Sequence, residues 1–343
     1  MKKHANIPIF IPHLGCPNQC VFCNQRSITG VDGFDAEKVR DIIDEALSTI
    51  PKSLDTEIAF FGGSFTGIDR ELMIKLLGIA NEYVVDGRIS SIRCSTRPDY
   101  INGEILQILK KYSVKTIELG LQSYDDNVLS LCKRGHTSID EKTACALIVS
   151  KGFELIGQMM IGLPGSTLES ELKTAEFIIN SGAHGARIYP TIVFKETELA
   201  DMANCNIYVP LTLDDAIERS ASVFELFVEK NIDVIRIGLC ASENLSHEDK
   251  FFAGPNHPAL GEMVESEYYF KKITKLLNKS NINSLDCPTV IVSKGSLSKA
   301  IGHKKVNKER LIRKFGFTDI IFREDSLIRG YEVRLEEGKR KCI

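Results

Sequence analysis

The stretch Pro12–Gln25, PHLGCPNQCVFCNQ, carries three cysteines, Cys16, Cys20 and Cys23, in the pattern C-x3-C-x2-C. It follows the apolar run Ile7–Ile11, which is typical of a strand. Closely spaced thiolates favour a soft metal or an iron–sulfur cluster. A structural zinc site needs a fourth ligand, and no Cys or His follows at suitable spacing. The pattern therefore favours a cluster with one iron open to a small molecule, and the alternative is three buried structural thiols.

Length and composition indicate one large domain with an appendage. The chain has 343 residues, 43% of them hydrophobic, and a formal net charge of −3. Residues 294–341 contain 14 Lys or Arg and 7 Asp or Glu, a balance of +7, so the rest of the chain carries −10. A basic segment on an acidic body indicates an anionic partner for that segment.

The sequence shows no secretory signal and no apolar stretch long enough for a membrane span. We therefore expect a cytoplasmic protein without a membrane partner. The ten cysteines then lie in a reducing compartment and do not form a disulfide framework. Those outside the cluster motif are expected to be mostly small core residues.

Short apolar runs alternate with amphipathic stretches along most of the chain, which predicts a parallel sheet with helices outside it, either open or curled into a barrel. The predicted strands are Ile7–Ile11, Glu57–Phe61, Ser91–Ser95, Thr116–Leu121, Glu154–Ile161, Gly185–Tyr189 and Ile232–Leu239. The predicted helices between them are Asp35–Ile50, Asp69–Tyr83, Asn102–Lys111, Asp140–Lys151, Leu168–Ser181 and Leu213–Lys230.

Glycine-rich or polar loops follow these strands, at the edge where parallel folds place reactive groups. Gly62 and Gly63 would let a ligand approach the backbone, and Ser64 comes next. Gln122 offers a donor and an acceptor, which suits ribose hydroxyls. Arg134 has the planar fork that pairs with carboxylates, although a surface charge is an equally good interpretation.

The cysteine pattern, with Phe22 before the third cysteine, resembles the radical S-adenosylmethionine (SAM) superfamily. The strings GGSFTG, TRPDY, ELGLQS, KRGHT and MMIGLPG resemble the radical SAM half of the catalytic subunit of the Elongator complex, which modifies the wobble uridine of transfer RNA. A weaker likeness, through LQS and GLPG, runs to oxygen-independent coproporphyrinogen oxidase. The Elongator likeness covers about Ile7 to Tyr189. No glycine-rich pyrophosphate loop follows residue 190, so acetyl-CoA chemistry is not expected.

The resemblance implies a partial parallel β/α barrel, a 4Fe–4S cluster and SAM, whose reductive cleavage gives a 5′-deoxyadenosyl radical. It implies an electron donor, such as a reductase, flavodoxin or ferredoxin. It also implies residue roles: Cys16, Cys20 and Cys23 hold the cluster, Gly62 and Gly63 contact the SAM amino group, Gln122 the ribose, Arg134 the carboxylate and Gly162 the adenine. Ser64 is expected to belong to the same cofactor-binding set, although it departs from the Glu often found at that position in the family.

The C-terminal part is predicted to be a small α+β module similar to KH-type RNA-binding modules. Its expected elements are a strand at Pro288–Ser293, helices at Ser296–Ile301 and Lys305–Phe315, and a strand at Thr318–Phe322. The turn between the helices has Lys305 where a GxxG motif has its last glycine. The cations expected to contact RNA phosphates are Lys299, Lys304, Lys305, Lys308, Arg310, Arg313 and Lys314.

These observations predict a radical SAM barrel at residues 1–240, a connecting loop and helix at 241–284, and the basic module at 285–343. The expected function is hydrogen abstraction from a nucleotide in RNA, with transfer RNA preferred. Two alternatives stay open: a radical SAM enzyme acting on a small molecule or tetrapyrrole, and a non-catalytic RNA-binding iron–sulfur protein. The oligomeric state is not predicted.

Overall fold

A computed structural model describes residues 4–11, 14–16, 20–24, 34–239, 250–280, 282 and 287–336. The chain divides into two compact units. Unit 1 comprises Met1–Leu211 and Ile232–Pro255, and unit 2 comprises Thr212–Asn231 and Asn256–Ile343. The helix predicted at Leu213–Lys230 therefore groups with unit 2, and the domain boundaries at residues 240 and 285 stay a prediction.

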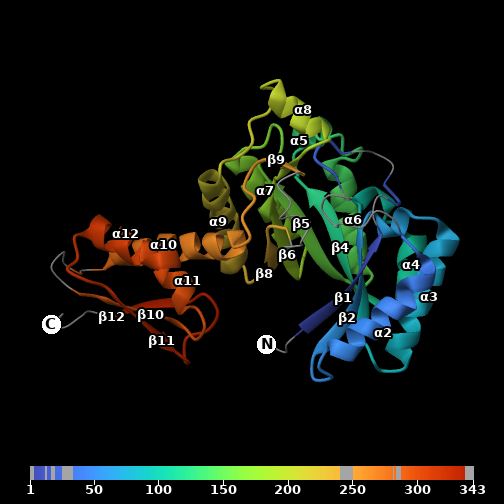
Figure 1. The fold of residues 1–343 in the computed structure, drawn as a ribbon, viewed down its shortest axis with the longest axis horizontal. Coiled ribbons are helices and arrows are strands. Elements are labelled where there is room, and N and C mark those ends of the chain that lie inside the picture. Colours follow the sequence, from blue (N-terminus) through green and yellow to red (C-terminus); the bar gives the residue numbers. More distant parts are fainter. Residues whose placement is uncertain are drawn as a thin grey trace. The chain divides into compact units, whose positions relative to one another are not determined.

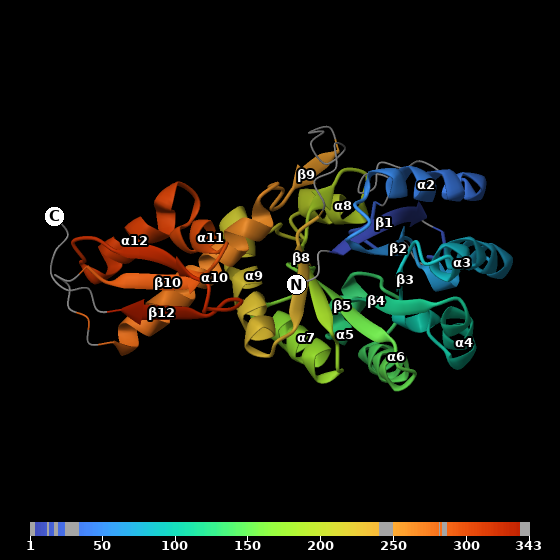
Figure 2. The same ribbon diagram turned by 90° about the horizontal axis from the view of Figure 1, so that it is seen from below.

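Unit 1 is built on seven parallel strands that pair in chain order, β1-β2-β3-β4-β5-β6-β8. Seen end-on in Figure 2, they form an arc, so the predicted partial β/α barrel is confirmed. The strands are β1 (His4–Ile11), β2 (Asp55–Gly62), β3 (Ser91–Thr96), β4 (Val114–Gln122), β5 (Glu154–Ile161), β6 (Gly185–Pro190) and β8 (Asp233–Ile237).

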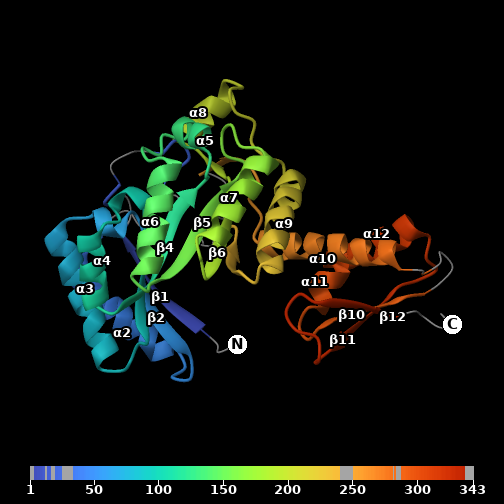
Figure 3. The same cartoon turned by 180° about the vertical axis from the view of Figure 1, so that it is seen from behind.

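The helices that connect these strands lie on the outer side of the arc (Figures 2 and 3). They are α2 (Val39–Thr49), α3 (Arg70–Val85), α4 (Gly103–Lys111), α6 (Ser138–Ser150) and α7 (Leu168–Asn180). Three short 3-10 turns also occur between the strands along the chain: η1 (Ala36–Lys38), η2 (Phe65–Gly67) and η3 (Pro98–Tyr100). Thr137 and Thr167 begin α6 and α7 with capping boxes, which satisfy backbone N–H groups that a helix start leaves unpaired.

Besides the 3-10 turns η2 and η3, four short elements of unit 1 were not predicted from the sequence. They are α5 (Asp126–Leu131), β7 (Val193–Phe194), α8 (Glu198–Asn204) and β9 (Phe251–Ala253), and β7 pairs with β9 antiparallel. Figure 1 shows α5, α8 and β9 at the end of the sheet where the strands terminate. These elements are too short to give a clear hydrophobic period, so sequence patterning gives no signal for them.

Charged side chains form a buried network across the strands of unit 1. Glu118 on β4 is fully buried and accepts hydrogen bonds from Arg93 on β3 (2.9 Å) and Arg187 on β6 (2.8 Å). Arg93 also donates to Glu57 on β2 through Nε (2.7 Å). Burial alone would raise the pKa of Glu118, but the charges of Arg187 and Arg93 outweigh it and lower that pKa. Glu118 is therefore a buried carboxylate with two cationic partners.

Unit 2 packs helices on one side of a three-stranded sheet (Figure 1). β10 is central, parallel to β11 and antiparallel to β12. The predicted α+β module is confirmed, although β11 begins later than expected and β12 was not predicted. The elements are α9 (Leu213–Glu229), α10 (Leu260–Lys279), β10 (Thr289–Ser293), α11 (Leu297–Ile301), η5 (His303–Lys305), α12 (Val306–Phe315), β11 (Ile321–Asp325) and β12 (Val333–Glu336). No helix among the described residues of the chain could span a membrane.

Candidate active site

The cysteine loop and the glycine loop after β2 approach each other through their backbones. The N–H of Gly63 donates to the carbonyl of Ile11 (2.8 Å), and that of Ser64 donates to the carbonyl of Leu14 (3.2 Å). A Cβ at Gly63 would lie 2.1 Å from the Leu14 carbonyl oxygen, and one at Gly15 would lie 2.2 Å from that of Ser64. Glycine at these positions is what lets the loop with Cys16 lie against the end of β2.

The second half of the cysteine motif is held by elements that the sequence did not predict. The N–H of Val21 donates to the carbonyl of Cys132 (3.3 Å), and the N–H of Leu199 on α8 donates to the carbonyl of Val21 (2.9 Å). Val21 and Leu199 share a buried apolar cluster, against which Phe22 packs. Val21, between Cys20 and Cys23, thus fixes this part of the motif to α5 and α8. The sequence signal that could have predicted α8 is Thr197, whose side chain caps its first turn.

Two buried arginines lie beside the cysteines. Arg134 Nη1 donates to Cys20 Sγ (3.3 Å), and Nη2 donates to the carbonyl of Gly120 (2.6 Å). Arg97 donates to the carbonyl of Arg134 and is held by Asp99 through two hydrogen bonds of 2.9 and 3.0 Å. Arg134 is only 6% exposed, so the interpretation of a surface charge is wrong.

The surroundings of Cys16 have opposing effects on the pKa of its thiol. Burial raises the pKa of the Cys16 thiol, and a backbone hydrogen bond from Ser64 and the charges of Arg97 and Arg134 counter the rise. Metal and cluster ligands must be thiolates, so the two cations favour the form that binds iron. Cys23 is half-buried, and its N–H donates to the carbonyl of Cys20 (3.0 Å).

Residues of the strings TRPD and KRGHT meet around a buried histidine. His136 is fully buried, with Nε2 3.1 Å from Glu141 Oε1 and Nδ1 3.8 Å from Asp99 Oδ1. Burial lowers the pKa of His136 to about 3, and the charges of Arg134 and Arg97 act in the same direction. Burial raises the pKa of Glu141. Asp99 thus links the arginine side of the assembly to its histidine side.

Gln122 ends β4 with a left-handed backbone, φ +72°, next to Gly120. A Cβ at Gly120 would lie 3.0 Å from Gln122 Nε2 and 3.6 Å from Arg134 Nη2, so this glycine leaves room for both side chains. Gln122 Oε1 is buried and has no hydrogen-bond partner within the part of the chain that the structure describes. A buried acceptor of this kind suits a hydroxyl donor from a ligand.

Ser64 and Gly162 have partners in their own chain. The hydroxyl of Ser64 is buried, lies 2.9 Å from Thr96 Oγ1 and accepts the N–H of Arg97 (3.2 Å). Gly162 donates its N–H to Glu171 (2.7 Å), and its carbonyl accepts the hydroxyl of Tyr208 (2.7 Å). Contact between Gly162 and an adenine stays a prediction.

The residues described above suit a cubane cluster and SAM. Across the described ranges, no three Cys, His, Asp or Glu side chains converge as they would around a single ion. A cubane binds each cysteine through a different iron, so such convergence is not required. The arginines beside Cys16 and Cys20, the close-packed glycines and the unpaired Gln122 oxygen all fit the two groups.

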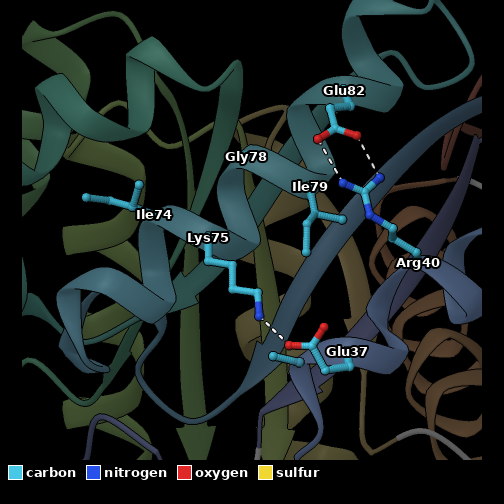
Figure 4. A pocket seen from close by; sticks show the side chains of 8 residues that line it. Glu37, Arg40, Ile74, Lys75, Gly78, Ile79 and Glu82 are labelled. Carbon is cyan, nitrogen blue, oxygen red and sulfur yellow. Dashed lines mark hydrogen bonds and ion pairs between the residues drawn. The ribbon is translucent and has the colours of Figure 1, made fainter.

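A surface cavity of about 330 Å³ lies elsewhere, between α2 and α3 (Figure 4). Two ion pairs occupy it, Arg40 with Glu82 (2.6 Å) and Lys75 with Glu37. Its charges are already paired and its lining belongs to the outer helices, so we assign no ligand to it.

Three of the predicted RNA-contacting cations have acidic partners inside unit 2. Lys299 pairs with Glu265, Lys308 with Asp319 (2.8 Å) and Arg310 with Glu267 (2.5 Å). By contrast, Lys304, Lys305, Arg313 and Lys314 are exposed, and no ion pair with another described residue involves them. The predicted set therefore divides into a paired group and an exposed group.

A partial barrel with a three-cysteine loop at the ends of its strands defines an iron–sulfur enzyme scaffold. Residues 10–178 match the model of the radical SAM superfamily, and residues 183–269 match the radical SAM C-terminal domain. The chain belongs to the radical SAM superfamily. Membership implies a 4Fe–4S cluster and SAM as cofactors and supports an enzyme.

Individual relatives cover parts of the chain. A tRNA uridine(34) acetyltransferase of Methanocaldococcus infernus is 32% identical over 134 residues, 38% of this chain and 25% of its own. Elongator complex protein 3 of Saccharomyces cerevisiae is 24% identical over 63% of this chain and 46% of its own. The heme chaperone HemW of Bacillus subtilis is 25% identical over 63% and 57%. The chain thus spans a quarter to somewhat over half of these relatives.

A solved structure supports the same fold. The archaeal Elp3 of Methanocaldococcus infernus, lacking residues 1–46 of its N-terminus, superposes with a TM-score of 0.59 at 22% identity. The superposition covers 80% of this chain and 64% of that one. At this identity the likeness shows the shared fold alone.

Proposed function

We propose that this protein is a radical SAM enzyme that abstracts hydrogen from a nucleotide in RNA, with transfer RNA the preferred substrate. The main support for RNA as the substrate is the similarity to a tRNA uridine(34) acetyltransferase and to Elongator complex protein 3. The exposed cations Lys304, Lys305 and Arg313 of unit 2 support it, because exposed cations bind phosphates.

Each proposed residue has a defined task in this site. Cys16, Cys20 and Cys23 hold the cluster, and Gly62 and Gly63 fix the cysteine loop and let the amino group of SAM approach. Gln122 Oε1 accepts a ribose hydroxyl. The chemistry that the cluster and SAM supply when bound is reductive cleavage of SAM and hydrogen abstraction from the substrate. The proposal includes an external one-electron donor, such as a reductase, flavodoxin or ferredoxin.

The first test measures SAM cleavage by protein reconstituted without oxygen. We expect cleavage in the parent chain, none in the Cys16→Ala, Cys20→Ala, Cys23→Ala variant, and faster cleavage when transfer RNA is added. If the parent cleaves SAM no faster than the triple variant, the proposal that the protein is a radical SAM enzyme is wrong. Cleavage that transfer RNA leaves unchanged would refute the RNA substrate.

A second candidate function is action on a small molecule or tetrapyrrole, which the similarity to heme chaperone HemW favours. It predicts SAM cleavage that is indifferent to transfer RNA, and no salt-dependent RNA binding. Mass spectrometry of transfer RNA nucleosides from a deletion strain separates the two: a nucleoside that is lost or truncated supports the RNA substrate, and an unchanged profile supports the second candidate.

A further inference from the structure

Arg134 contacts a proposed cluster ligand directly. Its Nη1 donates to Cys20 Sγ at 3.3 Å, while its Nη2 donates to the carbonyl of Gly120 at 2.6 Å. Both terminal nitrogens of the guanidinium therefore bind acceptors of the protein itself. The resemblance to the family had suggested only a contact between Arg134 and the SAM carboxylate.

We propose that Arg134 is a positioning residue that acts through Cys20: it fixes the orientation of that sulfur and raises the reduction potential of the cluster. The inference rests on the cluster included in the proposed function, but on neither the substrate nor RNA.

The physical basis is the charge that the cluster gains on reduction. Hydrogen bonds to the sulfur ligands and nearby charges are among the main determinants of iron–sulfur potentials. A cation that donates to a ligand sulfur stabilises the more negative, reduced state. Arg134 is 6% exposed, so water screens its charge weakly. Its removal should therefore make reduction harder.

The surrounding residues hold Arg134 in place. Arg97 donates to the Arg134 carbonyl, and Asp99 orients Arg97 through a two-point hydrogen bond of 2.9 and 3.0 Å. Arg134 Nη2 is fixed on Gly120, two residues before Gln122. A side chain with this many constraints is preorganised to donate to Cys20.

The chain offers a matched control one residue away. Lys133 carries the same charge, but its side chain is 57% exposed and pairs with Glu198 at 2.6 Å. Lys133→Met removes one positive charge near the site without touching Cys20. Arg134→Met removes the same charge and both hydrogen bonds, and Arg134→Lys keeps the charge but cannot span Cys20 and Gly120.

The experiment is a redox titration of the reconstituted 343-residue chain without SAM or RNA, monitored by electron paramagnetic resonance, with iron and sulfide measured for each variant. We expect a midpoint potential more negative than that of the parent for Arg134→Met, a smaller negative shift for Arg134→Lys, and no shift for Lys133→Met.

An unchanged potential in Arg134→Met at parental iron content would overturn the proposal. A shift of the same size in Lys133→Met would also overturn the proposal. The change in potential would then come from the loss of any nearby positive charge and not from the contact with Cys20. If Arg134→Met does not retain iron, Arg134→Lys decides the matter: a negative shift in its potential supports the role, and a parental potential rejects it. Failure of the transfer RNA experiments would leave these results unaffected.

Discussion

Gly63 shows how one missing side chain determines the position of the cysteine loop. The family resemblance assigns it to SAM, and the structure adds a reason that acts before any ligand binds: the Leu14 carbonyl occupies the space of a Cβ. The contact is with backbone, which cannot move aside as a flexible side chain could. A methyl group there must displace the loop that carries Cys16.

Gly63→Ala is therefore expected to lower the iron content of the reconstituted protein and to destabilise unit 1 by about 1–3 kcal/mol, because the added methyl group overpacks the loop. Iron analysis and urea unfolding followed by circular dichroism measure the two effects. The control is Gly78→Ala in helix α3, where a Cβ meets nothing within 4 Å. Alanine there should stabilise the chain by about 0.5–1 kcal/mol. Parental iron content in Gly63→Ala would contradict the packing argument.

The neighbours of Arg134 in the string KRGHT indicated from the sequence that this residue has a role. They did not indicate that its side chain is buried. A sequence cannot show whether an arginine between two helices points outward or inward. Here the carbonyl of Gly120 and the sulfur of Cys20 determine the direction, and both are distant along the chain. Gln122 is similar: its type suggested a ligand, whereas the unpaired oxygen and the left-handed backbone became visible only in the fold.

At the scale of elements, the loop after β3 and the start of α6 meet around a buried histidine–glutamate pair. His136 and Glu141 lie on either side of the cap residue Thr137, and Asp99 approaches from η3. Neither group is exposed to water, so their protonation affects the stability of the elements that they join.

The pair predicts a plateau in stability with pH. Burial raises the folded pKa of Glu141 above 4.5, so its contribution to stability is complete below pH 4.5 and is lost as the pH rises. Burial lowers the folded pKa of His136 from 6.5 to about 3, so its contribution is complete above pH 6.5 and is lost as the pH falls. Between pH 4.5 and pH 6.5, the loss of the Glu141 contribution with rising pH cancels the gain of the His136 contribution. Above this range the Glu141 contribution declines alone, and below it the His136 contribution declines alone, by up to about 1.4 kcal/mol per pH unit.

The measurement is the urea midpoint of the parent and of His136→Gln, Glu141→Gln from about pH 3.5 to about pH 8.5. The difference between the two should be flat between pH 4.5 and 6.5 and should change outside that range. A difference that varies steadily across the plateau would show that the two groups do not titrate as a pair.

At the scale of the whole chain, charge is distributed less simply than its sequence suggests. Residues 294–341 have an excess of cations, which favoured an RNA-binding module. The structure places Glu265 and Glu267 of α10 beside Lys299 and Arg310, so helix α10 neutralises part of that excess. The exposed group, Lys304, Lys305 and Arg313, is the better candidate for phosphate contacts.

Two triple variants test this division by the salt dependence of transfer RNA binding. Replacing Lys304, Lys305 and Arg313 by Gln should weaken binding and reduce the slope of log K against log salt by about two to three, because each lost phosphate contact lowers it by about 0.7–0.9. The same replacement of Lys299, Lys308 and Arg310 removes the same charge from the paired group and should change the slope less. Equal slopes in the two variants would contradict a specific role for the exposed group.

The sequence by itself determined the repeating strand–helix order, the three-cysteine motif and the loops at the ends of the strands, because these depend on local periodicity, turn residues and short motifs. Only the tertiary structure decided that Arg134 contacts Cys20, that Leu199 on α8 anchors Val21, and that three of the seven cations predicted to contact RNA have acidic partners within unit 2. Each of these depends on contacts between segments far apart in the chain, whose partners are set by how helices and strands pack and not by any pattern within one segment.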